Sequence, residues 1–200
     1  MADEPEQPVA VAEEEEVGDE LTPGYKPPKQ KTLEEITKLD ADDESLVKYK
    51  QSLLAGADKV LDEGGKNVIV KALVFAPDGR DPICLDLTGD LATLKNKPFV
   101  LKEGTSYKIH IEFRVQREIV SGLRYMQVVY RKGIKVDKAK LMVGSYGPKT
   151  EAHVYKTPGE EAPAGLMHRG TYVVKSKFSD DDNNAILEWE WSFQLKKDWA

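Results

Sequence analysis

The chain has 200 residues, of which 40% are apolar, 32% charged and 8% aromatic. A typical domain takes about 100–200 residues, so this length predicts one folded domain with some chain to spare. The net charge of −6 argues against nucleic acid as the main partner, because domains that bind nucleic acid carry a basic surface.

The charge is divided unevenly along the chain. Residues 1–66 hold 18 Asp and Glu against 8 Lys and Arg, a net charge of −10, whereas residues 67–200 hold 17 acidic and 21 basic residues, a net charge of +4. An acidic arm is therefore expected before a slightly basic body.

Residues 1–31 are predicted to form a disordered acidic tail. They contain the run Glu13–Glu16 and too few large apolar residues to offset the entropy lost on ordering. Such a tail either keeps the protein soluble or meets a basic segment of a partner, and the sequence leaves both roles open.

Residues 32–66 are predicted to form a helix–turn–helix arm. Thr32–Glu35 is a capping box, and it opens a short helix with Leu33, Ile36 and Leu39 on one face. The acidic turn 40–44 then supplies carboxylates for the start of a second helix, on which Leu46, Tyr49 and Leu53 recur at helical spacing before Gly56 as a C-cap.

From residue 67 the apolar pattern changes from helical to strand period. Residues 107–115 and 187–195 alternate strictly between apolar and polar side chains, and weaker strand signals lie at 68–75, 83–87, 124–130, 141–143, 154–155 and 171–178. Several short strands without a long helix between them predict an all-β fold, an immunoglobulin-like antiparallel β-sandwich over residues 67–200.

Three features favour a cytoplasmic protein without stable membrane insertion. The longest apolar run is 72–76, far short of the roughly 20 residues that cross a bilayer. The first residues lack the basic and apolar regions of a secretory signal. The single cysteine, Cys84, cannot form an internal disulfide, and we expect it to be a small buried residue on a strand.

The sequence gives little support to an enzyme or a metal site. His110, His153 and His168 lie on different segments, and no GxSxG, P-loop or CxxC motif occurs. Residues 40–51 begin like an EF-hand loop, but Ser45 replaces its glycine and Gln51 replaces its final carboxylate. Acidic residues in later turns, Asp86, Asp90 and 180–182, are more simply explained as solvated turn residues than as calcium ligands.

The apolar face of the last predicted strand carries Trp189 and Trp191, two of the three tryptophans in the chain. A stripe of this kind usually fills a core, but large aromatic side chains can also hold two sheets apart and line a slot for an apolar ligand. Periodicity does not distinguish the two.

A series of short motifs, taken in order from about residue 25 to the C-terminus, resembles the Rho GDP-dissociation inhibitor family. The motifs are Lys26–Pro28, Leu33–Ile36, Asp42–Leu46, Lys48–Lys50, Leu85–Leu91, Phe99–Gly104, Glu118–Leu123, Met142–Pro148, Glu160–Pro163 and Leu187–Trp191. The resemblance implies a non-enzymatic regulator of Rho signalling that binds GDP-bound, prenylated Rho-family GTPases in a 1:1 complex. It also implies a monomer when free, no cofactor, and the geranylgeranyl group of the partner as ligand.

The resemblance also assigns residues to two sites. It implies contacts to the GTPase switch regions at Asp42, Asp43, Ser45, Leu46 and Tyr49. It implies a prenyl pocket, with Asp182 near its mouth, lined by Leu54, Phe75, Phe99, Tyr107, Ile119, Leu123, Met167, Val174, Trp189 and Trp191. The alternative is a general carrier of prenylated proteins that does not control nucleotide exchange.

This sequence departs from the family pattern at a few positions. Pro98 stands where the family has a regulatory serine, so control by phosphorylation is not expected there. Thr32 and Thr171 occupy two other serine positions and keep a hydroxyl group. Phe75 and Met167 replace aliphatic residues, which is expected to reshape the pocket and not to abolish it.

Overall fold

The computed structural model describes residues 43–54 and 65–199. The predicted acidic tail, the first helix with its capping box, Asp42 and the Gly56 cap lie outside the described residues. Within the predicted arm the structure describes one helix, α2 (Glu44–Leu54), at the position of the predicted second helix. The Asp43 carboxylate caps it, because Oδ1 accepts hydrogen bonds from the backbone N–H groups of Ser45 (2.9 Å) and Leu46 (3.2 Å).

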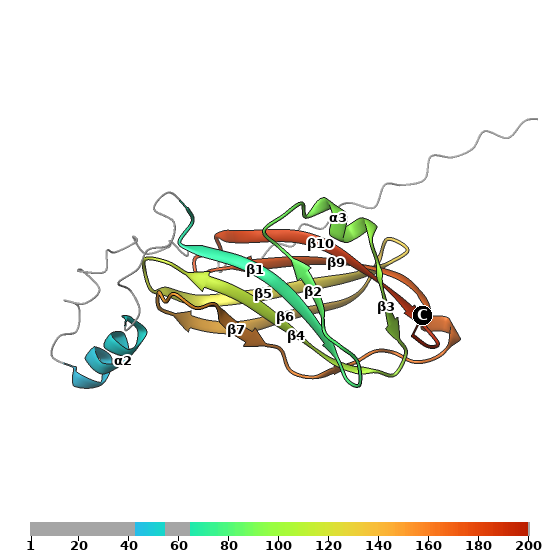
Figure 1. Cartoon of the computed structure of the whole chain (residues 1–200), viewed down its shortest axis with the longest axis horizontal. Coiled ribbons are helices and arrows are strands. Elements are labelled where there is room, and N and C mark those ends of the chain that lie inside the picture. Colours follow the sequence, from blue (N-terminus) through green and yellow to red (C-terminus); the bar gives the residue numbers. More distant parts are fainter. Residues whose placement is uncertain (1–42, 55–64, 200) are drawn as a thin grey trace, which may run out of the picture.

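Among the described residues, ten strands form two sheets that pack face to face, which confirms the predicted all-β sandwich (Figure 1). The first sheet has the order β2-β1-β4-β7, and β8 pairs with β4. Its strands are β1 (Val68–Pro77), β2 (Ile83–Asp86), β4 (Ser106–Val115), β7 (His153–Lys156) and β8 (Glu160–Glu161).

The second sheet has the order β3-β10-β9-β5-β6. Its strands are β3 (Phe99–Lys102), β5 (Val120–Arg131), β6 (Ile134–Tyr146), β9 (Gly170–Ser179) and β10 (Ala185–Lys196). Two short helices, α3 (Ala92–Asn96) and the 3₁₀ helix η1 (Leu166–His168), lie in the connections.

The core lies between the sheets and is built from the alternating apolar side chains of the inner strands. On β4, Ile109, Ile111, Phe113 and Val115 are buried, as the strict alternation predicts. They meet the inward face of β5, β9 and β10, including Leu123, Tyr125, Val174, Phe178, Trp189 and Trp191. This packing fixes which side chains each strand directs between the sheets.

Three details differ from the sequence prediction. β3 pairs with β10 in parallel, so the sandwich is not purely antiparallel. β6 runs over 13 residues, where the pattern predicted only 141–143, because its first half is an exposed edge rich in lysine and its alternation is interrupted at Lys138. Cys84 lies on β2 as expected but is exposed, because Ile83 and Leu85 on this edge strand take the positions that face the core.

Gly122 is predicted to be intolerant of any side chain. Its φ is +60°, and a Cβ would lie 2.7 Å from Cβ and Cγ of Asp181. Gly79 has a similar φ of +76°, but a Cβ there would meet no atom within 4 Å. A substitution at Gly79 therefore measures the cost of the backbone conformation without a steric clash. We expect Gly79→Ala to cost about 1 kcal/mol and Gly122→Ala to cost about 2–4 kcal/mol in the free energy of unfolding by urea. Equal losses would mean that Asp181 moves away freely.

Candidate functional site

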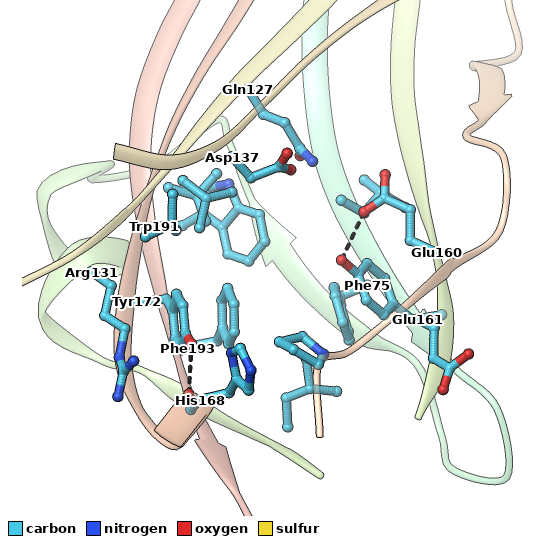
Figure 2. A pocket seen from close by; sticks show the side chains of 17 residues that line it. Phe75, Gln127, Arg131, Asp137, Glu160, Glu161, His168, Tyr172, Trp191 and Phe193 are labelled. Atoms are coloured by element: carbon cyan, nitrogen blue, oxygen red, sulfur yellow. Dashed lines mark hydrogen bonds between the residues drawn. The ribbon is translucent and has the colours of Figure 1, made fainter. Parts of the chain in front are cut away.

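A cavity of about 720 Å³ lies between the two sheets at the end of the sandwich that holds the β5–β6 turn, β8 and η1 (Figure 2). Its inner lining is mostly apolar and comes from both sheets: Phe75, Leu101, Tyr107, Ile109, Gln127, Val129, Tyr172, Val174, Trp191 and Phe193. Its remaining lining residues are largely exposed, so that the cavity is open there: Arg131, Val136, Asp137, Glu160, Glu161, Pro163 and His168. We call this rim the mouth.

Aromatic rings stiffen the inner wall. Phe75 stacks on Tyr107 with ring centroids 4.6 Å apart, and Phe99 stacks on Trp191 at 5.8 Å. Tyr172 and Phe193, neighbours on β9 and β10, stack at 5.0 Å with nearly parallel planes. Rings that support one another in this way cannot turn into the empty space, so the wall keeps its shape.

A buried polar network holds the back of this wall. The indole Nε1 of Trp191 donates to Ser176 Oγ at 3.0 Å, and the Tyr125 hydroxyl donates to Gln127 Oε1 at 3.1 Å. Ser176 Oγ and the Tyr125 hydroxyl oxygen are 3.0 Å apart. Because Tyr125 already donates its proton to Gln127, the Ser176 hydroxyl is the donor in this second hydrogen bond. Burial raises the pKa of Tyr125, which keeps its hydroxyl protonated and able to donate. Trp191 and Gln127 are thereby held in fixed orientations along the cavity.

The mouth carries charge of both signs (Figure 2). Asp137, Glu160 and Glu161 supply carboxylates, whereas Arg131 and His168 lie on another side of the opening. The Tyr107 hydroxyl donates to Glu160 Oε2 at 2.7 Å, and burial together with the Glu160 charge raises the pKa of Tyr107. Glu160 is thus fixed beside the apolar wall, where its charge remains available to a cation.

The cavity brings together four of the residues that the resemblance assigns to a prenyl pocket: Phe75, Tyr107, Val174 and Trp191. Phe99 supports Trp191 from behind. Met167 is 80% exposed beside His168 at the mouth. Those assigned roles remain predictions.

The other assigned residues do not line this cavity. Leu123 and Trp189 are buried elsewhere in the core, Ile119 is half-buried just before β5, and the side chain of Leu54 lies outside the described residues. Asp182 lies in the turn between β9 and β10, at the opposite end of these strands from Tyr172 and Phe193. The structure therefore does not bring Asp182 to the mouth of this cavity, because the mouth opens where β9 begins.

Several lining residues have no clear signal in the sequence. Gln127 and Arg131 share the inward face of β5 with Tyr125 and Val129, and two polar residues on that face hide the alternation. Glu160, Glu161 and His168 lie on short elements without any period. The pairing of residues 125–131 with residues 172–178 of β9 could have placed Gln127 and Arg131, but the register of two strands cannot be read from the sequence.

On α2 two of the predicted GTPase contacts, Leu46 and the polar contact Tyr49, are exposed. Leu46 is 41% exposed and Tyr49, three residues further along, is 53% exposed, so they share one face of the helix. Asp43 and Ser45 begin this helix, and the Asp43 side chain is engaged in the cap. The arrangement offers a surface for binding.

Neither a metal centre nor a spanning helix is found in the part of the chain that the structure describes. No group of three or more His, Cys, Asp or Glu among residues 43–54 and 65–199 could hold a metal ion. No helix in these ranges is long and apolar enough to cross a membrane.

Comparison with known proteins gives a consistent result. The family model described as RHO protein GDP dissociation inhibitor matches residues 10–198. Rho GDP-dissociation inhibitor 1 of Homo sapiens is 52% identical over 189 residues, which cover 94% of this chain and 92% of that protein. Rho GDP-dissociation inhibitor 3 is 51% identical over 186 residues in Bos taurus (92% of this chain, 83% of that protein). The Homo sapiens form of inhibitor 3 is 47% identical over 200 residues (100% of this chain, 88% of that protein).

The polar network predicts a large effect of Ser176→Ala. This change removes the acceptor of Trp191 and a partner of Tyr125 in a buried site, which costs about 1–3 kcal/mol for each polar group left unsatisfied. Ser192→Ala is the matched control, because Ser192 is equally buried but donates only to the Lys95 carbonyl. Thermal unfolding is expected to show the larger loss for Ser176→Ala. A loss no greater than that of Ser192→Ala would contradict the network.

Proposed function

Because this chain belongs to the Rho GDP-dissociation inhibitor family and functions as such an inhibitor, we propose that its ligand is a GDP-bound, prenylated Rho-family GTPase, held in a 1:1 complex. The geranylgeranyl chain of the GTPase would occupy the cavity between the sheets. The observation that carries this proposal is the open, aromatic-walled cavity of about 720 Å³ at one end of the sandwich. An elongated apolar chain suits a slot lined on two sides by apolar side chains.

The free-energy balance requires a second contact. Burying a C20 chain at about 0.8 kcal/mol per methylene gives at most roughly 16 kcal/mol. A bilayer offers the same chain a comparable gain, so the cavity alone would barely compete with the membrane. Extraction from the membrane therefore needs a further interaction with the protein part of the GTPase.

The rim of the cavity supports recognition of a basic segment next to the lipid. Asp137, Glu160 and Glu161 place carboxylates at the mouth, where the chain that carries the lipid must leave the cavity. Membranes hold basic segments next to lipid anchors through anionic headgroups. Carboxylates at the mouth can replace these headgroups when the lipid moves from the bilayer into the protein.

The second contact is assigned to the arm. The exposed Leu46 and Tyr49 on the capped helix α2 offer an apolar and hydrogen-bonding face to the switch regions of the GTPase. The switch regions also hold the nucleotide and its Mg²⁺, so a clamp on them would slow GDP release. No bond is made or broken, so the action is that of a binding protein that needs no cofactor. We propose that the free protein is a cytoplasmic monomer that acts upstream of the actin cytoskeleton.

The cavity assignment predicts different effects of two neighbouring tryptophans. Trp191 lines the cavity, whereas Trp189, on the same face of β10 and similarly buried, does not. Trp191→Leu is expected to reduce the affinity for a geranylgeranylated GTPase about tenfold or more relative to the unprenylated GTPase. Trp189→Leu is the control for lost core packing, and thermal unfolding of both variants checks that they fold. Equal loss of affinity for both GTPase forms would argue against a separate lipid site.

The arm assignment predicts that a change on α2 affects the inhibition of GDP release and not the binding of the lipid. Tyr49→Ala should weaken inhibition of GDP release while leaving the affinity for a prenylated peptide unchanged, with Lys48→Ala as the neighbouring exposed control. Asp43→Asn keeps a side chain that caps the helix but removes its charge, whereas Asp43→Ala removes both. If Asp43→Asn behaves as the unaltered protein and Asp43→Ala does not, Asp43 acts only through the cap. Full inhibition of GDP release by both Tyr49→Ala and Asp43→Ala would contradict the arm assignment, whereas a lack of inhibition by the unaltered protein would favour the general carrier of prenylated proteins.

A further inference from the structure

One wall of the cavity is formed by residues 163–169, which we call the mouth segment. Pro163 and His168 line the cavity, and Leu166 and Met167 between them are 75% and 80% exposed. Both ends are anchored to sheets by backbone hydrogen bonds, since Ala162 N–H donates to the Thr105 carbonyl and Gly170 pairs with Leu195. Gly165 and Gly170 have φ of +107° and +140°, values that only glycine adopts easily, so the path of the segment depends on glycine at both positions.

Between these anchors, side chains tie the mouth segment to its surroundings. Glu103, in the turn that follows β3, accepts hydrogen bonds from Arg169 at both carboxylate oxygens, each 2.8 Å long. Glu103 Oε2 also accepts the backbone N–H of Gly165 at 3.1 Å. One carboxylate thus holds the segment at two points, four residues apart.

Two further bonds reach the segment from residues that line the cavity themselves. Arg131 Nη2 donates to the Arg169 carbonyl at 2.7 Å, and the Tyr172 hydroxyl donates to the His168 carbonyl at 2.5 Å (Figure 2). Substitution of either residue would change both the wall and any ligand contact. Glu103 and Arg169 do not line the cavity. Substitution of either residue therefore changes how the segment is held without changing a residue that lines the cavity.

The pair of Glu103 and Arg169 keeps both of its charges at physiological pH. The hydrogen bonds from Arg169 lower the pKa of Glu103 to about 2, so the carboxylate is charged throughout the range from pH 5 to pH 8. A bidentate contact between arginine and a carboxylate fixes orientation as well as distance. The segment is consequently held in one position by a contact that ordinary changes of pH do not release.

We propose that Glu103 and Arg169 are positioning residues for the lipid site: they hold the mouth segment as a wall of the cavity and so set how fast a bound prenyl chain leaves. This inference rests on the proposed function, since it concerns the lipid in the same cavity. Without the ion pair the segment is held less firmly between its anchors at Ala162 and Gly170, and Pro163 and His168 withdraw from the ligand. The mouth then opens more often, and dissociation is faster while association changes little.

The test is a double-mutant cycle on the full chain with Glu103→Gln, Arg169→Gln and both together. The probe is a fluorescent peptide that ends in geranylgeranyl-cysteine methyl ester, and its dissociation rate is measured after addition of excess unlabelled peptide. We expect each single variant to release the peptide about 5- to 10-fold faster, and the double variant to release it no faster than either single, because both remove the same contact. Asp181→Asn is the control, since it breaks an arginine–carboxylate pair with Arg124, also 2.8 Å long, at the opposite end of the sandwich.

Hydrogen exchange of the free protein supplies a second measurement. Faster exchange of the Gly165 and His168 amides in Glu103→Gln, and not in Asp181→Asn, supports the positioning role. An unchanged dissociation rate, additive effects of the two single variants, or an equal effect of Asp181→Asn would overturn it. If the unaltered protein does not bind the peptide, the proposed lipid site fails, and the exchange experiment alone decides whether Glu103 positions the segment.

Discussion

The cavity depends on the hydrogen bonds that hold Trp191 against the second sheet. Two sheets of a sandwich close on each other wherever side chains can turn into the space between them, because empty apolar space costs dispersion contacts. Ser176, as acceptor of the Trp191 indole and partner of Tyr125, prevents that movement at the back of the cavity. Rotating Trp191 into the cavity would leave its indole N–H without an acceptor and would remove the donor to Ser176 Oγ in a buried site. The open space is therefore maintained by the cost of breaking a polar network.

The two walls of the cavity differ in how they are held. The wall formed by β9 and β10 combines ladder hydrogen bonds between the strands, stacked rings and the buried polar network, so it belongs to the most stable part of the fold. The mouth segment is joined to the same body mainly through side chains, among which Glu103 makes three hydrogen bonds. A site with one rigid wall and one wall held by a few side-chain contacts can keep its shape on average. It can still open at the second wall to admit a long chain.

The sequence determines much of the fold and only part of the site. Strict alternation predicted β4 and β10, and the carboxylates before residue 45 predicted the cap of α2, because both signals are local. The position of the cavity was not predictable, since Trp189 and Trp191 share one face of β10 and only three-dimensional packing makes the second a lining residue and the first a core residue. Register between β5 and β9, which brings Gln127 opposite Ser176, depends on pairing over a long distance in the chain. The motifs of the family pointed to four residues that line the cavity, but resemblance does not show at which end of the strands it opens.

If the cavity holds a prenyl chain as proposed, the bilayer and the cavity offer that chain nearly equal free energies of burial, and this near equality decides how the two sites must work together. A very tight cavity would retain its lipid and prevent return of the GTPase to the membrane, whereas a moderate one lets a second contact set the direction of transfer. Joining a lipid site and a protein site in one chain raises the effective concentration of each for its target, so modest affinities at both sites suffice. In such a system a change that touches only the rate of lipid release alters the lifetime of the complex and leaves recognition of the protein partner intact. The mouth segment, held from outside the cavity by Glu103, is where the fold separates these two properties.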